Sequence, residues 1–164
     1  MFKLFRLQTL ILIFALSVLG AKSLIAANME ADEAAAYANL IHNLVSKSSI
    51  SKKGALCVFG NDSVAKSLRR SSENMAVSQN LEESRRKCRA IYVSAENATN
   101  LKVYLDGMAK EKILTISTFE QFVDNGGMIQ VGMGRRDFEL IVDVKSLHAA
   151  QIKLDTLSAN LIIN

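Results

Sequence analysis

The chain contains no proline and no tryptophan, and it has only two cysteines and two histidines. Without proline, its turns depend on glycine, asparagine, aspartate and serine. His42 and His148 have no Cys, Asp or Glu around them at the spacing of a metal site. The G-x-S-x-G motif of serine hydrolases is also missing. We therefore expect a protein that is not an enzyme and that uses no metal and no cofactor.

Long apolar runs are missing from the sequence except at its start. Lys3 and Arg6 make a basic beginning, and the stretch 7–19 is mostly apolar. This stretch has about 13 residues, whereas a helix that spans a bilayer needs roughly 20. The layout is typical of a secretory signal peptide.

Small residues follow the apolar stretch, and we expect cleavage after Ala26 or Ala27. Residues 1–27 would then be the signal peptide, and residues 28–164 would form one exported domain. An uncleaved membrane anchor is the alternative. No cysteine lies near the cleavage region, which argues against a lipoprotein.

The positive charge of the chain belongs largely to this signal. The formal net charge is +4, and removal of the three basic residues of the signal leaves +1. A nucleic-acid partner is therefore not expected. Three local basic groups remain, and each is a solvated loop or helix end or, alternatively, a surface for an acidic partner: Arg69-Arg70, Arg85-Arg86-Lys87 with Arg89, and Arg135-Arg136.

Helical and extended patterns alternate along the chain. Helical spacing is expected at Glu30–Val45, Val64–Arg70, Leu101–Met108, Phe119–Val123 and from Ser146 onward. For Phe119–Val123, Ser117 and Glu120 have the spacing of a capping box. Strands are expected at Ala55–Phe59, Met75–Ser78, Ala90–Val93, Ile113–Ile116, Met128–Met133 and Phe138–Val144.

This alternation predicts a single α/β domain with a mostly parallel sheet and helices on both faces, in flavodoxin-like order, ending in a β-hairpin. Gly132-Met133-Gly134 resembles a dinucleotide fingerprint, but Asp137 stands where the third glycine belongs, and we interpret it as part of the hairpin. A hairpin at the end of the sheet would leave an exposed edge, which proteins usually cover or pair. We therefore expect a homodimer.

Polar residues follow the predicted strands at their carboxyl ends. They are Asn61, Asp62, Ser94, Glu96 and Ser117. Ligands of open α/β sheets bind at this rim, where helix N-termini favour anions. Ordinary helix capping is the alternative explanation.

The two cysteines, Cys57 and Cys88, lie in or next to predicted strands. An even number of cysteines in an exported protein suggests a disulfide, with two buried free thiols as the alternative. No C-x-x-C motif is present, so a disulfide here would be structural rather than catalytic.

The segment Ile113–Asn164 resembles the C-terminal half of the YfiR-like family of periplasmic regulators. The family's L-T-[IV]-S, F, G-G-M-I and A-G-L-K-I-S are matched by Leu114-Thr115-Ile116-Ser117, Phe122, Gly126-Gly127-Met128-Ile129 and Ala150-Gln151-Ile152-Lys153-Leu154. The G-[ND]-D and S-x-E of the family are matched by Gly60-Asn61-Asp62 and Ser94-Ala95-Glu96. Gln151 departs from the pattern, because the family has glycine there.

The resemblance implies that Cys57 and Cys88 pair, which flavodoxin-like order also allows because it makes the strands that carry them neighbours. It also implies a soluble periplasmic inhibitor that restrains a membrane-bound diguanylate cyclase through the periplasmic sensor region of that enzyme. Through the cyclase, such an inhibitor would regulate cyclic-di-GMP signalling and biofilm formation. An outer-membrane lipoprotein could sequester the inhibitor. A periplasmic sensor of small ligands that acts on a different partner is the alternative function.

Overall fold

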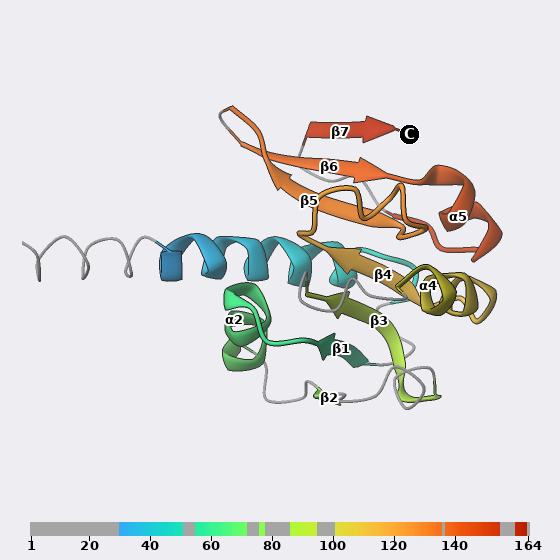
Figure 1. Cartoon of the computed structure of the whole chain (residues 1–164), viewed down its shortest axis with the longest axis horizontal. Coiled ribbons are helices and arrows are strands. Elements are labelled where there is room, and N and C mark those ends of the chain that lie inside the picture. The colour runs from blue at the N-terminus through green and yellow to red at the C-terminus, as the bar shows by residue number, and fades with distance from the viewer. Residues whose placement is uncertain are drawn as a thin grey trace, which may run out of the picture.

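A computed structural model describes residues 30–50, 55–71, 76–77, 86–94, 101–135, 137–154 and 160–163 (Figure 1). The predicted signal peptide and its cleavage site at Ala26 or Ala27 lie outside these residues. None of the helices in the described part of the chain is long and apolar enough to cross a membrane.

One sheet of seven strands organises the described part of the chain, in the order β2-β1-β3-β4-β5-β6-β7. Its first five strands follow flavodoxin-like order and are parallel, β6 runs antiparallel to β5, and β7 runs parallel to β6. The strands are β1 (Ala55–Phe59), β2 (Ala76–Val77), β3 (Cys88–Val93), β4 (Leu114–Ser117), β5 (Ile129–Met133), β6 (Phe138–Val142) and β7 (Asn160–Ile163).

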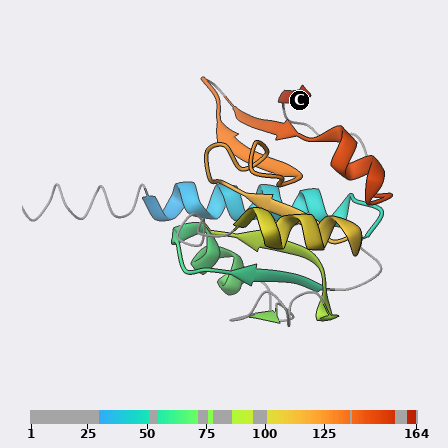
Figure 2. The ribbon, with the colours of Figure 1, turned by 45° about the vertical axis from the view of Figure 1, so that its right-hand side comes forward.

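The helices cover both faces of this sheet (Figures 1 and 2). They are the helix 30–46, α2 (Ser63–Ser71), α4 (Leu101–Lys110) and α5 (Val144–Ala149). The predicted fold class is therefore confirmed.

The first face carries the larger core. The helix 30–46 buries Ala34, Ala38, Ile41 and Leu44, which recur at helical spacing, against strand residues such as Tyr92. α2 and α5 pack on the same side. The ring of Tyr37 also meets the ring of Phe138 edge-on, with centroids 5.0 Å apart, which ties the hairpin to this helix.

The second face is covered by α4 and by the loop that joins β4 to β5. Leu101, Leu105 and Met108 of α4 pack with Ile91, and Phe122 of the loop belongs to the same cluster. The strands alternate between the two faces because successive side chains of a strand point in opposite directions.

The helix expected at Phe119–Val123 is wrong. The segment forms a series of hydrogen-bonded turns instead. The Ser117 hydroxyl accepts the N–H of Phe119 at 3.0 Å and donates to the carbonyl of Val93 at 2.6 Å, so it does not form the expected capping box. The buried residues of the segment are the adjacent Phe122 and Val123, which do not form a helical stripe.

The predicted hairpin is present, but it does not form the edge of the sheet. β5 and β6 pair in register, and the N–H of Gly134 donates to the carbonyl of Asp137 at 2.8 Å to close the turn. β7 then pairs along β6 and becomes the outermost strand. The sequence pattern does not predict β7 as a strand, because its segment is short and follows a region without clear periodicity.

Candidate functional site

The carboxyl ends of β1, β3 and β4 lie side by side at one edge of the sheet, because these strands are parallel neighbours. The strand order reverses between β1 and β3, and open α/β sheets bind ligands at such a point. The predicted rim residues therefore belong to one region, with the exception of Glu96, which lies outside the described residues.

Asp62 is held by two interactions within the chain. One carboxylate oxygen accepts the N–H of Ala65 at 2.7 Å and so caps α2. The other accepts the hydroxyl of Tyr92 at 2.9 Å. Asp62 thus joins the start of α2 to the middle of the sheet.

Tyr92 and Thr118 complete this polar network, and neither residue is marked as a site residue by the sequence pattern. Their hydroxyl groups lie 2.9 Å apart. Burial raises the pKa of Tyr92 well above its ordinary value, so the phenol stays neutral and keeps its donor. Only the alternation of β3 hints at this role, since it turns Tyr92 toward α2 while Ile91 and Val93 face α4.

Arg69 holds the loop that precedes Asp62. Its guanidinium donates to the side-chain oxygen of Asn61 at 3.0 Å and to the carbonyl of Gly60. The expectation of a solvated helix end is therefore wrong for Arg69, which is half-buried, and it describes the exposed Arg70 correctly. Asn61 is positioned by this arginine.

The two serines of the rim are buried. The N–H of Ser94 donates to the carbonyl of Phe59 at 2.9 Å, which links the ends of β3 and β1. Ser117 is fully buried, and its hydroxyl bonds the backbone of Val93 in β3 and of Phe119 just after β4. The structure thus brings Asn61, Asp62 and Ser94 to one edge and directs the Ser117 hydroxyl to the backbone of Val93 and Phe119.

The loop 118–128 is fixed by side chains from the strands beside it. Thr115 of β4 accepts the N–H of Met128 at 3.0 Å, and Gln130 of β5 accepts the N–H of Phe122 at 2.9 Å. Gly127 lies against the ring of Phe122. The residues that carried the family resemblance therefore build the connection that replaces a helix between β4 and β5.

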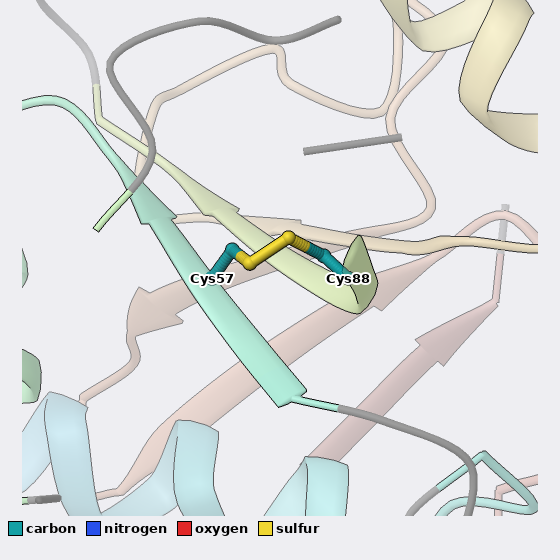
Figure 3. Close-up of a disulfide and its surroundings, with 2 residues drawn as sticks. All are labelled: Cys57 and Cys88. Carbon is teal, nitrogen blue, oxygen red and sulfur yellow. A yellow bond between two sulfur atoms is a disulfide. The ribbon is translucent and has the colours of Figure 1, made fainter. Parts of the chain in front are cut away.

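Cys57 and Cys88 form a disulfide between β1 and β3, with their Cα atoms 5.8 Å apart (Figure 3). This confirms the predicted pair, and the distance lies within the range that a disulfide requires. The register between β1 and β3 shifts by one residue, because Ala55 pairs with Cys88 whereas Leu56 pairs with Ala90. The shift leaves Arg89 as an extra residue and turns Cys88 to the same face as Cys57.

Both histidines lie on helices, His42 on the helix 30–46 and His148 on α5. The Nε2 atom of His42 is 2.8 Å from the hydroxyl of Ser71 at the end of α2. His148 lies in the last turn of α5. Among the described residues, no three His, Cys, Asp or Glu side chains gather in a group that could hold a metal ion.

The sequence pattern of the YfiR/HmsC-like family matches residues 35–157. The chain belongs to this family. The match includes both cysteines, the loop 118–128 and the hairpin, and it confirms the resemblance drawn from the sequence. A search of curated proteins finds no match.

Among solved structures, the YfiR/HmsC-like chain is similar to a conserved domain protein from Vibrio cholerae O1 biovar eltor str. N16961. The TM-score is 0.55 and the sequence identity is 11%, and the alignment covers 80% of this chain and 60% of that one. At this identity the likeness concerns the fold alone. The chain spans less than two thirds of the length of that protein.

Proposed function

We propose that the protein is an exported, non-enzymatic regulator that binds the periplasmic sensor region of a membrane-bound diguanylate cyclase and restrains it. The match to the YfiR/HmsC-like family over residues 35–157 carries this proposal, because that family suggests a periplasmic regulator of diguanylate cyclase. Residues 1–27 would act as the signal peptide and residues 28–164 as the periplasmic domain. An outer-membrane lipoprotein is the proposed second partner, which would sequester the regulator and release the cyclase.

Several polar groups at the sheet edge are engaged within the chain. Both carboxylate oxygens of Asp62 and the hydroxyl of Ser117 are engaged within the chain. These groups stabilise the fold, and a partner would meet a rigid scaffold whose specificity lies in its surface.

Deletion of the gene tests the proposal. Cellular cyclic-di-GMP and biofilm formation should rise, and the full-length gene should restore both. A matched variant that lacks residues 1–27 should not restore them, because it stays in the cytoplasm. Unchanged cyclic-di-GMP after both deletion and overexpression would contradict the proposal.

A small-ligand sensor is the second candidate function. Asn61, Asp62 and Ser94 gather at the point where the strand order reverses, which favours this alternative. A thermal-shift screen with anionic metabolites tests it, because a ligand at a hundred times its dissociation constant stabilises a protein by about 2.7 kcal/mol. Binding that survives Asp62→Asn and Asn61→Ala together would place the ligand elsewhere.

We also propose that the regulator is a homodimer. The edge expected at the hairpin is occupied by β7, so the hairpin no longer supplies the reason for association. The need to protect a sheet edge remains and passes to the strand that is now outermost. Light scattering of the purified protein measures the association directly.

A further inference from the structure

Basic side chains gather at the amino edge of the sheet, which we define as the edge where the parallel strands β1, β3 and β4 begin. Arg86 and Lys87 directly precede β3, and Lys110 and Lys112 lie at the end of α4, just before β4. β3 and β4 are parallel neighbours, so the two pairs of cations lie at the same edge. All four side chains are exposed.

Lys153 and Lys47 extend this group across the sheet. The ammonium group of Lys112 donates to the side-chain oxygen of Gln151, which brings the end of α5 beside the end of α4. The carbonyl of Lys153 accepts the N–H of Ser49 at 2.9 Å. The end of the first helix, which Lys47 follows, therefore reaches the same edge. Both Lys153 and Lys47 are exposed.

α5 begins at the amino edge as well, because β6 runs antiparallel to β5 and ends there. Its first residues are the apolar Val144, which is 44% exposed, and the exposed Lys145. Figure 1 shows the start of β3 together with α4 and α5 on the right-hand side. The amino edge therefore combines many cations with one exposed apolar side chain.

Two carboxylates lie among these cations in the described part of the chain. Asp143 is half-buried and accepts hydrogen bonds from the N–H and the hydroxyl of Ser146. The other carboxylate is Glu111. With seven Lys and Arg side chains beside two carboxylates, the edge has a net charge of +5. The seven are Lys47, Arg86, Lys87, Lys110, Lys112, Lys145 and Lys153.

Acidic residues lie toward the carboxyl edge instead. The first helix begins on that side of the sheet (Figures 1 and 2), and its first turn contains Glu30, Asp32 and Glu33, all exposed. Asp62 follows β1 at the same edge, and Glu120 follows β4. The charges of the described chain are thus separated along the direction of the strands.

We infer that the amino edge docks on an anionic lipid surface. The inference rests on the proposed function only for the location of the protein beside a membrane. Lys and Arg side chains spread over several segments suit a plane of phosphate groups, because each cation near such a surface adds to binding. Cations around an exposed apolar side chain are also typical of surfaces that enter the headgroup region.

The docked molecule has one orientation. With the amino edge against the lipid, the carboxyl edge and its residues Asn61 and Asp62 face away from the membrane. An acidic protein surface is the other kind of partner that a basic edge attracts, and the experiments separate the two.

Cosedimentation with lipid vesicles tests the inference on protein purified from the periplasm. Vesicles of phosphatidylcholine with about one third phosphatidylglycerol should bind the wild type, and vesicles of phosphatidylcholine alone should not. Lys110→Gln, Lys112→Gln and Lys153→Gln together should lower the partition coefficient on the order of a hundredfold, about fivefold for each charge. Salt at about 1 M should release the wild type, because the Debye length falls to about 3 Å.

A matched triple variant separates the position of the charge from its amount. Lys66→Gln, Arg70→Gln and Arg135→Gln remove the same charge from exposed sites on α2 and in the hairpin turn, which lie toward the carboxyl edge (Figure 1). This variant should change the partition coefficient less than about twofold, because its sites lie beyond the Debye length from the lipid. Equal losses in the two triple variants would overturn the inference.

An introduced tryptophan measures the orientation, because the chain has none of its own. Val144→Trp should show a blue-shifted emission on the anionic vesicles, since an indole ring at the amino edge enters the membrane interface. Met133 ends β5 toward the carboxyl edge and is 52% exposed, so Met133→Trp should keep its emission. A shift in Met133→Trp without one in Val144→Trp would overturn the proposed edge.

The outcomes separate the inference from the proposed function. A wild type that binds neither kind of vesicle would overturn membrane docking, whatever gene deletion shows about the cyclase. If that wild type restrains the cyclase and the variant with three lysines replaced does not, the amino edge belongs to an acidic protein surface. Vesicle binding at the amino edge with unchanged cyclic-di-GMP on deletion would support the docking and contradict the proposed function.

Discussion

Gly127 has no room for a side chain. A Cβ atom at this position would lie 2.2 Å from two ring carbons of Phe122, which is itself fully buried. Gly126, its neighbour, has a φ of 93°, which side-chain-bearing residues rarely adopt. The two glycines of the family motif thus meet different requirements, one of packing and one of backbone conformation.

Gly127→Ala should lower the free energy of unfolding by about 2–3 kcal/mol, because the tightly packed ring must shift. Urea denaturation measures this change. Gly132→Ala is the matched control, since a Cβ atom there meets nothing within 4 Å, and its effect should stay within about 0.5 kcal/mol. Equal losses in the two variants would contradict the packing explanation.

Gln151 is strained by its backbone. It follows α5 with a φ of 57°, in the left-handed region that glycine favours after a helix. The N–H of Ile152 donates to the carbonyl of Leu147 at 2.9 Å, which is the hydrogen bond of this type of helix end. The family's glycine at this place is therefore explained, and this chain departs from it at a conformational cost.

Gln151→Gly should raise the free energy of unfolding by about 0.5–1 kcal/mol, because relief of the left-handed strain exceeds the added flexibility of the unfolded chain. The loss of the side-chain bond to Lys112 reduces the gain only slightly, since this pair is exposed. Ala150→Gly, one residue earlier at a φ of −76°, should destabilise instead. Thermal or urea unfolding measures both signs, and a destabilised Gln151→Gly would contradict the argument.

His42 makes stability depend on pH near neutrality. Burial lowers the pKa of His42 below its ordinary value. The unfolded chain then binds more protons than the folded chain, so stability is full above the unfolded pKa of about 6.5 and falls as the pH drops toward the folded pKa. The Ser71 hydroxyl, which donates to the carbonyl of Leu68, accepts from the imidazole in either protonation state.

The wild type should therefore lose stability between about pH 7.5 and pH 5.5, and His42→Gln should lose less over the same range. Urea unfolding at a series of pH values measures the difference in slope. Asp143 does not contribute in this pH range. Burial raises the pKa of its carboxyl, but hydrogen bonds from Ser146 and from the backbone N–H of Lys145, together with the charge of Lys145, outweigh burial and hold that pKa below its usual range. Identical slopes would show that His42 is not responsible.

β3 contains one extra residue beside the cysteine of the disulfide. Regular alternation would place Cys88 on the same face as Ala90 and Tyr92, away from Cys57. The one-residue shift at Arg89 reverses this placement. A bulge of this kind re-aims the side chain beside it.

Deletion of Arg89 should leave the disulfide intact, because Cys88 then directly precedes Ala90 and regular alternation keeps Cys88 on the face of Cys57. Alkylation followed by mass spectrometry of periplasmic protein should find no free thiol. Replacement by alanine, Arg89→Ala, keeps the extra residue and should also keep the disulfide. Two free thiols after the deletion would contradict this account of the register.

The whole domain is stabilised by the same disulfide, which closes a segment of 31 residues. On the chain-entropy model, such a loop contributes about 3–4 kcal/mol. This is a large part of the 5–15 kcal/mol that is typical of a folded domain. Loss of the disulfide should therefore act on the amount of folded protein in the cell.

The double variant Cys57→Ala, Cys88→Ala should lower unfolding free energy by about 2–5 kcal/mol and reduce the periplasmic level of the protein. Cellular cyclic-di-GMP should then rise as it does on gene deletion, although no partner surface has changed. Immunoblots and cyclic-di-GMP measurements on the same cultures test both effects. Restraint that is lost at a normal protein level would show instead that the disulfide lies at the contact with the cyclase.

Local sequence patterns determined most elements of this protein and its fold class. Short apolar runs between helical stripes predict buried parallel strands, because such strands bury both of their faces. The helical spacing of the first helix places Ala34, Ile41 and Leu44 in the core, and Asp62 caps α2 as its position suggests. The cysteines and the Gly126-Gly127 motif indicated the disulfide and the family, both of which are confirmed.

Tertiary structure alone decided the features that depend on register and distant partners. Tyr92 meets Asp62 and Thr118 across 30 and 26 residues of sequence, the shift at Arg89 selects the face of Cys88, and β7 pairs with β6. Buried Phe122 holds the segment after β4 in turns where a capping box predicted a helix. Periodicity describes which residues are apolar, but strand register is set by packing between segments that local sequence does not relate.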